Sequence, residues 1–228
     1  MTDKIAKISE IFDSIQGEGP YVGCRQIFIR FCGCNILCDY CDTEFDKGEK
    51  YTVKQLVDKI KTFDLQAVHS VSITGGEPLI HYEFLSEFLP ELKKLGLKIY
   101  LETNGTLPES LNKIIDCVDI VSMDFKLDSS AKIGDLYTNH DMFLDIAVKN
   151  KKEVFAKLVF DDSLRDFEIN ECVSLAKKYG ILLVLQPKMH GKDICVSHDD
   201  IVNTFNKFTK LYHNTRLIGQ VHKFFDII

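Results

Sequence analysis

Residues 68–78 read Val-His-Ser-Val-Ser-Ile-Thr-Gly-Gly-Glu-Pro, and this stretch decides the fold class of the chain. The run Val68–Ile73 is rich in β-branched residues and is typical of a strand. It ends in a polar turn with two glycines, and Pro78 is favoured in the first turn of a helix. The stretch therefore predicts a strand that passes through a turn into a helix, as in a β-α-β unit.

The same alternation continues on both sides of this stretch. Strand-like runs occupy Gln26–Phe31, Val68–Ile73, Lys98–Leu101, Asp119–Met123, Val154–Phe160, Ile181–Leu185 and, more weakly, Arg216–Ile218. Helical stretches with apolar residues three and four apart occupy Val53–Phe63, Phe84–Leu95, Leu107–Ile115, Asp141–Lys149, Leu164–Tyr179 and Asp199–Leu211. This order predicts an α/β fold with a parallel sheet. It suits a partial or modified TIM-type (β/α) barrel of about six parallel strands, or an open doubly wound sheet. We expect one domain over residues 1–228.

Polar residues follow four of the predicted strands. They are Thr74, Gly75, Gly76 and Glu77, then Glu102, Thr103 and Asn104, then Asp124 and Lys126, and last Gln186. In α/β barrels the carboxyl ends of the strands converge on one face, where active sites are built. The pattern favours the barrel and predicts a site at that face, although loops after strands are also polar because water solvates them.

The charge balance excludes one class of function. The chain has 28 lysines and arginines against 34 aspartates and glutamates, which gives a formal net charge of −6. A protein that binds nucleic acid without sequence preference has a basic excess instead. The apolar runs are too short to span a bilayer, and Met1–Glu10 lacks the apolar run of a signal peptide. We therefore expect a cytoplasmic protein with no nucleic-acid and no membrane partner.

The cysteines are the unusual part of the composition. Of eight, four lie within ten residues: Cys32, Cys34, Cys38 and Cys41. In a reducing cytosol such a cluster is typical of a metal or iron–sulfur site and not of disulfides. Cys34, Cys38 and Cys41 have the spacing C-x3-C-x2-C, so three thiolates could hold a four-iron cluster and leave one iron open. An open position suits a site that binds a substrate-like molecule.

A structural zinc site that also uses Cys32 is the alternative interpretation. Such sites usually combine one cysteine knuckle with a second, distant knuckle, whereas all four thiols crowd together here. Cys32 directly follows the strand Gln26–Phe31, where a free cysteine is most often a small buried residue. The spacing therefore favours a site with three thiolates.

These features resemble the radical S-adenosylmethionine (SAM) enzymes. Their signature is the C-x3-C-x2-C loop with an aromatic residue, here Tyr40, before the last cysteine. The segment Gly75-Gly76-Glu77-Pro78, about 35 residues further on as β-α-β spacing allows, resembles their motif that holds the methionyl amino group. The resemblance implies a radical SAM core with its cluster loop at residues 32–43, a [4Fe–4S] cluster and SAM.

A narrower resemblance, to the 7-carboxy-7-deazaguanine synthase family, covers residues 8–228. The matching segments are 10–20 (EIFDSIQGEGP), 28–31 (FIRF), 33–35 (GCN), 41–43 (CDT), 74–78 (TGGEP), 102–106 (ETNGT), 186–187 (QP) and 222–223 (HK). It implies a carbon–nitrogen lyase of queuosine and deazapurine biosynthesis, which converts 6-carboxy-5,6,7,8-tetrahydropterin to 7-carboxy-7-deazaguanine by ring contraction with loss of ammonia. In that family a 5′-deoxyadenosyl radical takes the hydrogen from C6 of the pterin, and SAM is regenerated.

The family's roles carry over residue by residue. The resemblance implies that Cys34, Cys38 and Cys41 hold the [4Fe–4S] cluster and that Thr43 binds Mg²⁺. It implies SAM binding by Tyr40, Cys41, Asp42, Gly76, Glu77, Ser122, Met123, Asp124, Gln186, Pro187, Lys188 and Met189. It implies substrate binding by Ile15, Gln16, Gly17, Arg30, Thr74 and Ile228. The family often has Ser-Pro-Lys where this chain has Ser122-Met123-Asp124, so either this segment or Lys126 would contact SAM. The family also implies a one-electron donor such as flavodoxin or ferredoxin, and a homodimer.

Several residue types suit these roles. Arg30 offers a planar fork of donors for a carboxylate, and Gln16 offers the donor and the acceptor that a pterin edge requires. Lys157 lies in the middle of a predicted strand, where burial requires a partner or a position facing a site. Glu77 could accept bonds from an ammonium group or cap the helix that Pro78 begins.

Two other functions remain compatible with the motifs. Another radical SAM enzyme, such as one that places a glycyl radical on a partner protein, shares the cluster loop and Gly75-Gly76-Glu77-Pro78. It has no need of Gln16, Gly17 and Thr43 around a small pterin. A metal-binding module without catalysis is the second alternative.

Overall fold

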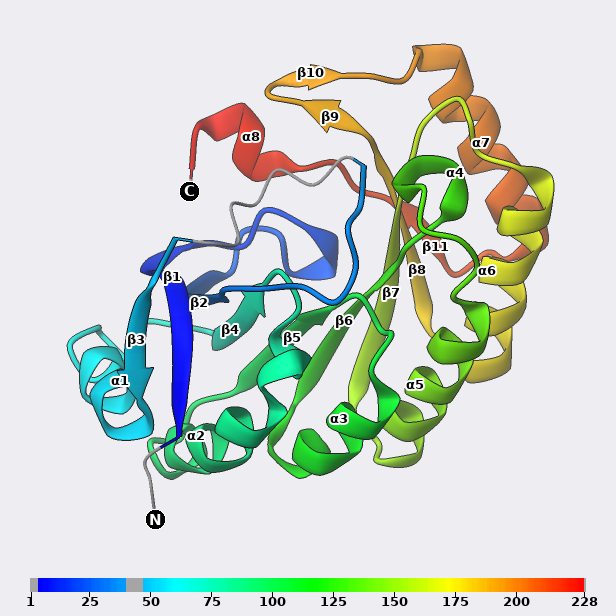
Figure 1. Ribbon diagram of the computed structural model, residues 1–228. Helices are drawn as coiled ribbons and strands as arrows, with labels where there is room; N and C mark the ends of the chain where they lie inside the picture. The colour runs from blue at the N-terminus through cyan, green and yellow to red at the C-terminus, as the bar shows by residue number, and fades with distance from the viewer. Residues whose placement is uncertain (1–3, 40–46, 228) are drawn as a thin grey trace.

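The structure is a computed structural model that describes residues 4–39 and 47–227 (Figure 1). In these ranges nine strands form one sheet in the order β11-β8-β7-β6-β5-β4-β2-β1-β3. They are β1 (Ile5–Ile15), β2 (Arg25–Phe31), β3 (Glu49–Thr52), β4 (Ser70–Gly75), β5 (Ile99–Thr103), β6 (Ile120–Phe125), β7 (Glu153–Phe160), β8 (Leu182–Pro187) and β11 (Thr215–Leu217). A separate hairpin consists of β9 (Met189–His190) and β10 (Asp193–Ile194).

Seven strands of the sheet pair in parallel: β2, β4, β5, β6, β7, β8 and β11. The predicted α/β fold with a parallel sheet is therefore confirmed. Six of them match the predicted runs to within about two residues at each end, the usual precision of strand limits. The weak run Arg216–Ile218 forms the short β11 and adds a seventh parallel strand where about six were expected. Because β3 and β11 end the sheet on opposite edges, it is open, as a partial barrel is.

Two strands that the sequence pattern did not predict extend the sheet beyond β2. The first half of β1 pairs antiparallel with β3, and its second half pairs antiparallel with β2. The register of β1 and β2 shifts between Ile8 and Glu10. A shift of this kind breaks the two-residue alternation of apolar and polar positions, which is the signal by which a strand is recognised. β1 places the segment that begins at Gln16 beside the parallel strands.

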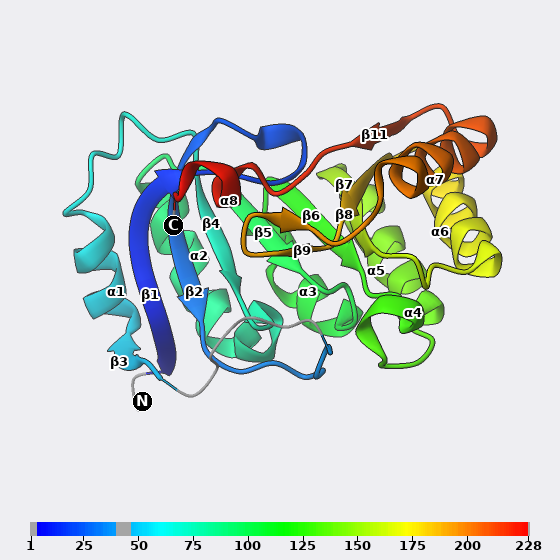
Figure 2. The same ribbon diagram turned by 90° about the horizontal axis from the view of Figure 1, so that it is seen from above.

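The helices alternate with the strands as predicted. The six expected helices are α1 (Val53–Ile60), α2 (Tyr82–Lys94), α3 (Pro108–Ile114), α5 (Tyr137–Lys149), α6 (Asp166–Tyr179) and α7 (His198–Leu211). The short α4 (Asp128–Ala131) and α8 (Val221–Phe225) were not predicted. Figures 1 and 2 show α2, α3, α5 and α6 along one face of the sheet, and α8 with the β9–β10 hairpin on the other side.

The main core lies between the sheet and these helices. In β2 the alternate residues Ile27, Ile29 and Phe31 are completely buried, and they belong to the same apolar cluster as Leu85 and Leu92 of α2. Burying one side chain of this size contributes about 1.5–3 kcal/mol to folding. The core therefore fixes which residues of each strand point to the other face.

In residues 4–39 and 47–227, every helix is too short or too polar to cross a membrane.

Candidate functional site

The face of the sheet away from these helices carries many polar side chains beside a small apolar cluster of Tyr100, Ile120, Phe155 and Val184. Since successive side chains of a strand point to opposite faces, the residues between the core positions gather there. Its buried or half-buried polar residues include Gln26, Arg30, Ser72, Thr74, Glu102, Asp124, Lys157 and Gln186. Burying so many polar groups costs free energy unless they bond to one another or to a ligand. This face is therefore the candidate site.

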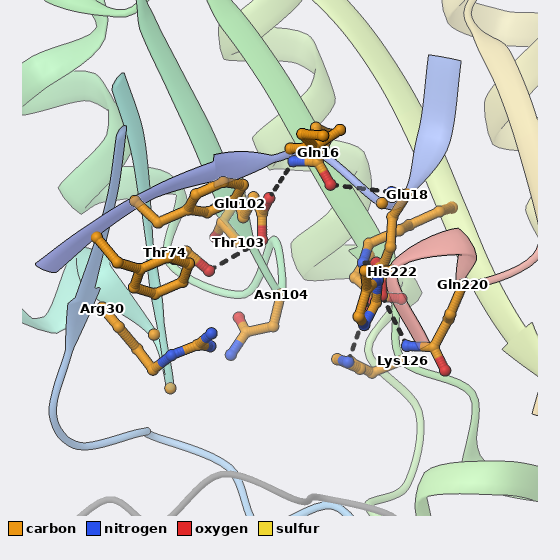
Figure 3. Close-up of a pocket in the computed structure, with 18 residues that line it drawn as sticks. Gln16, Glu18, Arg30, Thr74, Glu102, Thr103, Asn104, Lys126, Gln220 and His222 are labelled. Atoms are coloured by element: carbon orange, nitrogen blue, oxygen red, sulfur yellow. Dashed lines mark hydrogen bonds and ion pairs between the residues drawn. The ribbon is translucent and has the colours of Figure 1, made fainter. Parts of the chain in front are cut away.

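One cavity, of about 280 Å³, opens over β1, β2, β4 and β5, and we call it the arginine cavity (Figure 3). Its lining residues are Phe12, Ile15, Gln16, Gly17, Glu18, Phe28, Arg30, Thr74, Gly75, Gly76, Glu102, Thr103, Asn104, Asp124, Lys126, Lys157, Gln220 and His222. They include all five described residues for which substrate binding is predicted: Ile15, Gln16, Gly17, Arg30 and Thr74. The structure therefore brings this predicted set together.

Glu102 is held at the wall of the arginine cavity by three donors. Its carboxylate accepts hydrogen bonds from Gln16 Nε2 at 2.8 Å, Thr74 Oγ1 at 2.9 Å and Ser72 Oγ at 3.3 Å. Gln16 also donates to Gln26 Oε1 at 3.0 Å. A carboxylate fixed in this way has lone pairs left for N–H donors of a ligand.

Arg30 lies on β2, two strands from Glu102 on β5, with Thr74 of β4 between them. Its Nε donates to Glu10 Oε2 at 2.7 Å, so Arg30 forms an ion pair and also lines the cavity. Figure 3 shows the terminal nitrogens of Arg30 on the cavity side, near the amide of Asn104. These two nitrogens can donate to a planar anion such as a carboxylate.

A second cavity, of about 560 Å³, adjoins the first, and we call it the cysteine cavity. Its lining residues are Glu18, Cys34, Ile36, Cys38, Asp39, Gly75, Gly76, Asn104, Asp124, Lys126, Lys157, Val159, Gln186, Lys188, Met189, His190, Gly191, Cys195, Gln220 and Lys223. Eight of these also line the arginine cavity: Glu18, Gly75, Gly76, Asn104, Asp124, Lys126, Lys157 and Gln220. The two cavities therefore form one continuous site.

Two predicted cluster ligands, Cys34 and Cys38, line the cysteine cavity. Asn104 Nδ2 lies 3.9 Å from Cys34 Sγ. Thiolates are the ligands of iron–sulfur clusters, so this donor set fits the predicted cluster. Cys41, the third predicted ligand, lies outside the described residues.

Cys32 does not line either cavity. It is 5% exposed, and its Sγ donates to Lys47 O at 3.4 Å. The prediction that Cys32 is a small buried residue is confirmed.

Glu18 and Lys157 form a buried ion pair where the two cavities meet. Asp124 Oδ2 lies 3.7 Å from Lys157 Nζ and 2.8 Å from Lys126 Nζ. Burial by itself raises the pKa of Glu18, but the charge and hydrogen bond of Lys157 outweigh it and lower the pKa to about 2. Burial lowers the pKa of Lys157, but Glu18 and Asp124 raise it above its ordinary value. Both groups are therefore charged at neutral pH, and Lys157 has the partners that a buried lysine requires.

The C-terminal segment is fastened to the Gln16–Glu18 turn. Gln220 Nε2 donates to Glu18 Oε1 at 2.7 Å, and Val221 N donates to Gly17 O at 2.9 Å. A Cβ at Gly17 would lie 2.3 Å from His222 Nδ1, so only glycine allows this close approach. Gln220 and His222 consequently form part of the cavity wall, as Figure 3 shows.

Two buried acceptors at the site have no partner among the described residues. They are Asp124 Oδ1 and Gln186 Oε1. Buried acceptors are nearly always bonded in folded proteins, so these two atoms suit a ligand with N–H or O–H donors. Such donors are present in the ammonium and ribose hydroxyl groups of SAM. The predicted SAM-binding residues Gly76, Asp124, Gln186, Lys188 and Met189 all line the cysteine cavity.

Other predicted SAM contacts do not line either cavity. Ser122 and Pro187 are buried in their strands, and Met123 is completely buried in the main core on the helix side. A side chain on the core side of β6 cannot reach the cavity side, because successive residues point to opposite faces. Asp124 and Lys126 are the members of this segment that the structure brings to the site.

Glu77 lies beneath the site and not in its wall. Its carboxylate accepts bonds from Leu79 N at 3.0 Å, Asn104 N at 2.8 Å and Thr103 Oγ1 at 2.9 Å. The side chain is completely buried and caps the 3-10 turn that begins at Pro78. The geometry matches the helix-cap alternative and fixes Asn104 at the wall.

Glu77 predicts a pH-dependent stability. Burial raises its pKa to about 7, against an ordinary value of 4.5. The folded chain therefore binds this proton more tightly than the unfolded chain, and its free energy of unfolding falls as pH rises from about 4.5 to about 7. From about pH 5 to pH 8, the free energy of unfolding of the wild type should therefore fall by about 2 kcal/mol more than that of Glu77→Gln. Urea unfolding of both proteins at the two pH values measures this; parallel pH curves would contradict it.

Five predicted residues lie outside the described residues. They are Tyr40, Cys41, Asp42, Thr43 and Ile228.

Among the wall residues to which sequence reasoning gave no role are Phe12, Phe28 and Gln220. Phe12 and Phe28 line the arginine cavity, and their signal is the alternation of β2, in which Phe28 lies between the core residues Ile27 and Ile29. Phe12 could not be placed in the same way, because β1 was not recognised as a strand. Gln220 carries no local signal, since its position depends on Glu18.

Comparison with known proteins identifies the family. The model of the Radical SAM superfamily matches residues 28–152. The 7-carboxy-7-deazaguanine synthase of Geobacter sulfurreducens is 35% identical over 96% of each chain, and that of Archaeoglobus fulgidus is 34% identical over 97% of this chain and 99% of its own. The crystal structure of QueE from Escherichia coli, at 24% identity, shares the fold with a TM-score of 0.66 over 96% of this chain and 95% of its own. The chain belongs to the radical SAM superfamily and, within it, to the family of 7-carboxy-7-deazaguanine synthases.

Proposed function

We propose that this protein converts 6-carboxy-5,6,7,8-tetrahydropterin to 7-carboxy-7-deazaguanine, with ring contraction and loss of ammonia, in queuosine and deazapurine biosynthesis. The observation that carries the proposal is that the cysteine cavity and the arginine cavity adjoin and share eight lining residues. A ligand held by Arg30 and Glu102 would therefore lie next to the cofactors that Cys34 and Cys38 help to hold. The names of the relatives support this substrate.

Membership in the radical SAM superfamily implies a [4Fe–4S] cluster and SAM as cofactors. Cys34 and Cys38, with Cys41, would hold the cluster, and the acceptors of Asp124 and Gln186 would bond to SAM. Bound together, these cofactors supply one-electron chemistry that yields a radical able to abstract hydrogen from carbon. The chain's own residues then bind and orient the substrate.

The arginine cavity is complementary to a carboxylated pterin. The terminal nitrogens of Arg30 would bond to the carboxylate. The carboxylate of Glu102 would accept the N–H groups of the 2-amino-4-oxo edge, and Gln16 fixes its orientation at 2.8 Å. These two anchors, two strands apart in the sheet, would set which carbon faces the cysteine cavity.

The fastened C-terminal segment would limit the access of water. Gln220 and His222 form part of the cavity wall, and Glu18 holds Gln220 at 2.7 Å. Excluding water protects reactive intermediates from side reactions. Lys157 keeps its charge at the junction, where an anionic substrate needs a counterion.

Mg²⁺ dependence is a part of the proposal that rests on Thr43. A threonine hydroxyl together with the substrate carboxylate offers the hard oxygen ligands that Mg²⁺ prefers. Thr43→Ala should weaken the dependence of the rate on Mg²⁺ while leaving the iron content unchanged. Titration of activity with MgCl₂, beside iron analysis of the same sample, tests this; unchanged dependence would remove the metal role.

The proposal also includes the reaction class of the enzyme and its protein partners. Loss of ammonia makes the reaction that of a carbon–nitrogen lyase. A flavodoxin or ferredoxin would supply the electron, and two copies of the chain would form a homodimer. Measurement of electron transfer from the donor to this protein tests the first partner. Light scattering, which gives the mass of the particle in solution, tests the homodimer.

The deciding experiment is anaerobic incubation of the reduced, reconstituted protein with SAM and 6-carboxytetrahydropterin. The expected result is a product with the mass of 7-carboxy-7-deazaguanine and release of ammonia. Cleavage of SAM that does not depend on the pterin, together with a radical on an added protein, would favour a glycyl-radical activating enzyme. Bound zinc without iron or sulfide would favour a metal-binding module.

A further inference from the structure

Two phenylalanines stand side by side at the wall of the arginine cavity. Phe12 of β1 and Phe28 of β2 are direct cross-strand partners. Their ring centroids are 5.1 Å apart and their planes differ by 9°, which is a stacked pair. Both line the arginine cavity. We call this pair the aromatic wall.

The apolar core does not use the aromatic wall. Ile27 and Ile29, the neighbours of Phe28, are completely buried in the main core, so Phe28 points to the opposite face. Neither Phe12 nor Phe28 belongs to the two apolar clusters found in residues 4–39 and 47–227. Phe28 is nevertheless only 8% exposed, so its ring is covered by its neighbours at the cavity wall and not by the main core. The position of both rings against a cavity calls for a ligand with an apolar or aromatic face.

The wall lies beside Arg30, one of the two polar anchors of the cavity, on β1 and β2. The Cζ atom of Arg30 is 5.9 Å from the centroid of the Phe12 ring, and its Nε is fixed to Glu10 at 2.7 Å. Glu102 is tied to Thr74, the residue that pairs with Arg30 in the neighbouring strand. A ligand that bonds to Arg30 therefore lies beside the aromatic wall, and one that also reaches Glu102 extends from the wall over Thr74.

We infer that the aromatic wall is the surface on which the planar pyrimidinone half of the substrate lies, and that it sets the specificity for substrates with such a planar ring. The inference rests on the proposed function and adds two positioning residues to it. Stacking on an aromatic ring recognises the face of a heterocycle, while hydrogen bonds recognise its edge. Contact with the wall would fix the plane of the ring, and Arg30 and Glu102 would fix its rotation within that plane.

Steady-state kinetics of the reconstituted enzyme test the wall. Phe12→Leu and Phe28→Leu keep an apolar side chain and remove the ring. Each should raise KM for the carboxypterin by about tenfold, the effect expected of one lost stacking contact, with a small change in kcat. Phe12→Tyr keeps the ring and should restore the KM of the wild type. Calorimetric binding of 6-carboxypterin, the flat oxidised analogue, should weaken by the same factor.

A matched control comes from the outer surface. Phe167 also has an arginine over its ring, with Arg165 Cζ at 5.1 Å, but it lies on α6, away from both cavities. Phe167→Leu should leave KM unchanged. Wild-type turnover with an unchanged KM in both wall variants would overturn the inference and leave the proposed function intact. No turnover of the carboxypterin by the wild type would instead overturn the proposed function.

Discussion

Cys38→Ala is expected to give a folded protein without an iron–sulfur cluster and without turnover. Three thiolates are needed to hold the cluster and leave one iron open, and two thiolates cannot provide that arrangement. Cys38 lies in the wall of the cysteine cavity, so its removal leaves the core untouched. Iron and sulfide analysis after anaerobic reconstitution, with release of 5′-deoxyadenosine as the activity, measures the loss.

Cys32→Ala is the matched control for this prediction. Cys32 lies six residues before Cys38 but is buried and bonded to Lys47 O. Its replacement should cost about 1 kcal/mol of stability through lost packing and leave the iron content and turnover unchanged. Equal loss of metal in both variants would show that all four cysteines act as ligands, and the three-thiolate interpretation would then be wrong.

Lys157→Met is expected to cost about 3–5 kcal/mol of folding free energy, because it leaves Glu18 buried without its cation. The carboxylate of Asp124, 3.7 Å from Lys157 Nζ, also loses a neighbouring positive charge. Urea unfolding of the cluster-free protein measures the effect. The double variant Glu18→Gln with Lys157→Met should recover most of the loss, since no charge is then left unpaired. If the loss of folding free energy in the double variant equals the sum of the losses in the two single variants, Glu18 and Lys157 are not a coupled pair.

The pH dependence of the same pair has a definite sign. Because the pKa of Glu18 in the folded chain is about 2, below its ordinary 4.5, its stabilising contribution is present above about pH 4.5. The contribution is lost as pH falls toward 2, by about 3 kcal/mol in all. Glu18→Gln should remove this part of the acid sensitivity. If the acid unfolding curve of Glu18→Gln matches that of the wild type, Glu18 does not cause this acid sensitivity.

The pattern of apolar residues predicted the repeating part of the fold. The six parallel strands and the six long helices follow from periodicities of two and of three to four that are visible within each segment. β1 was missed because a register shift breaks its alternation, and β3 because its four residues, EKYT, are short and mostly polar. The short β11 was visible only as a weak run.

The site was predicted in part. The structure brings the motif residues Arg30, Thr74 and Gln16 to one cavity. Glu77 belongs to a matching motif and Met123 to a segment that departs from the family's, and the structure buries both side chains away from the cavity wall. A motif fixes a backbone segment, whereas the face that each side chain meets depends on how the strand packs.

The sequence by itself determined the order of strands and helices and the thiol spacing of the 34–41 loop. Each of these is a property of residues close together in the chain. Only the tertiary structure decided the pairing of Glu18 with Lys157, 139 residues apart, and with Gln220, 202 residues apart. Such contacts depend on strand order and register, which hold distant residues at one point in space, and no local periodicity records them.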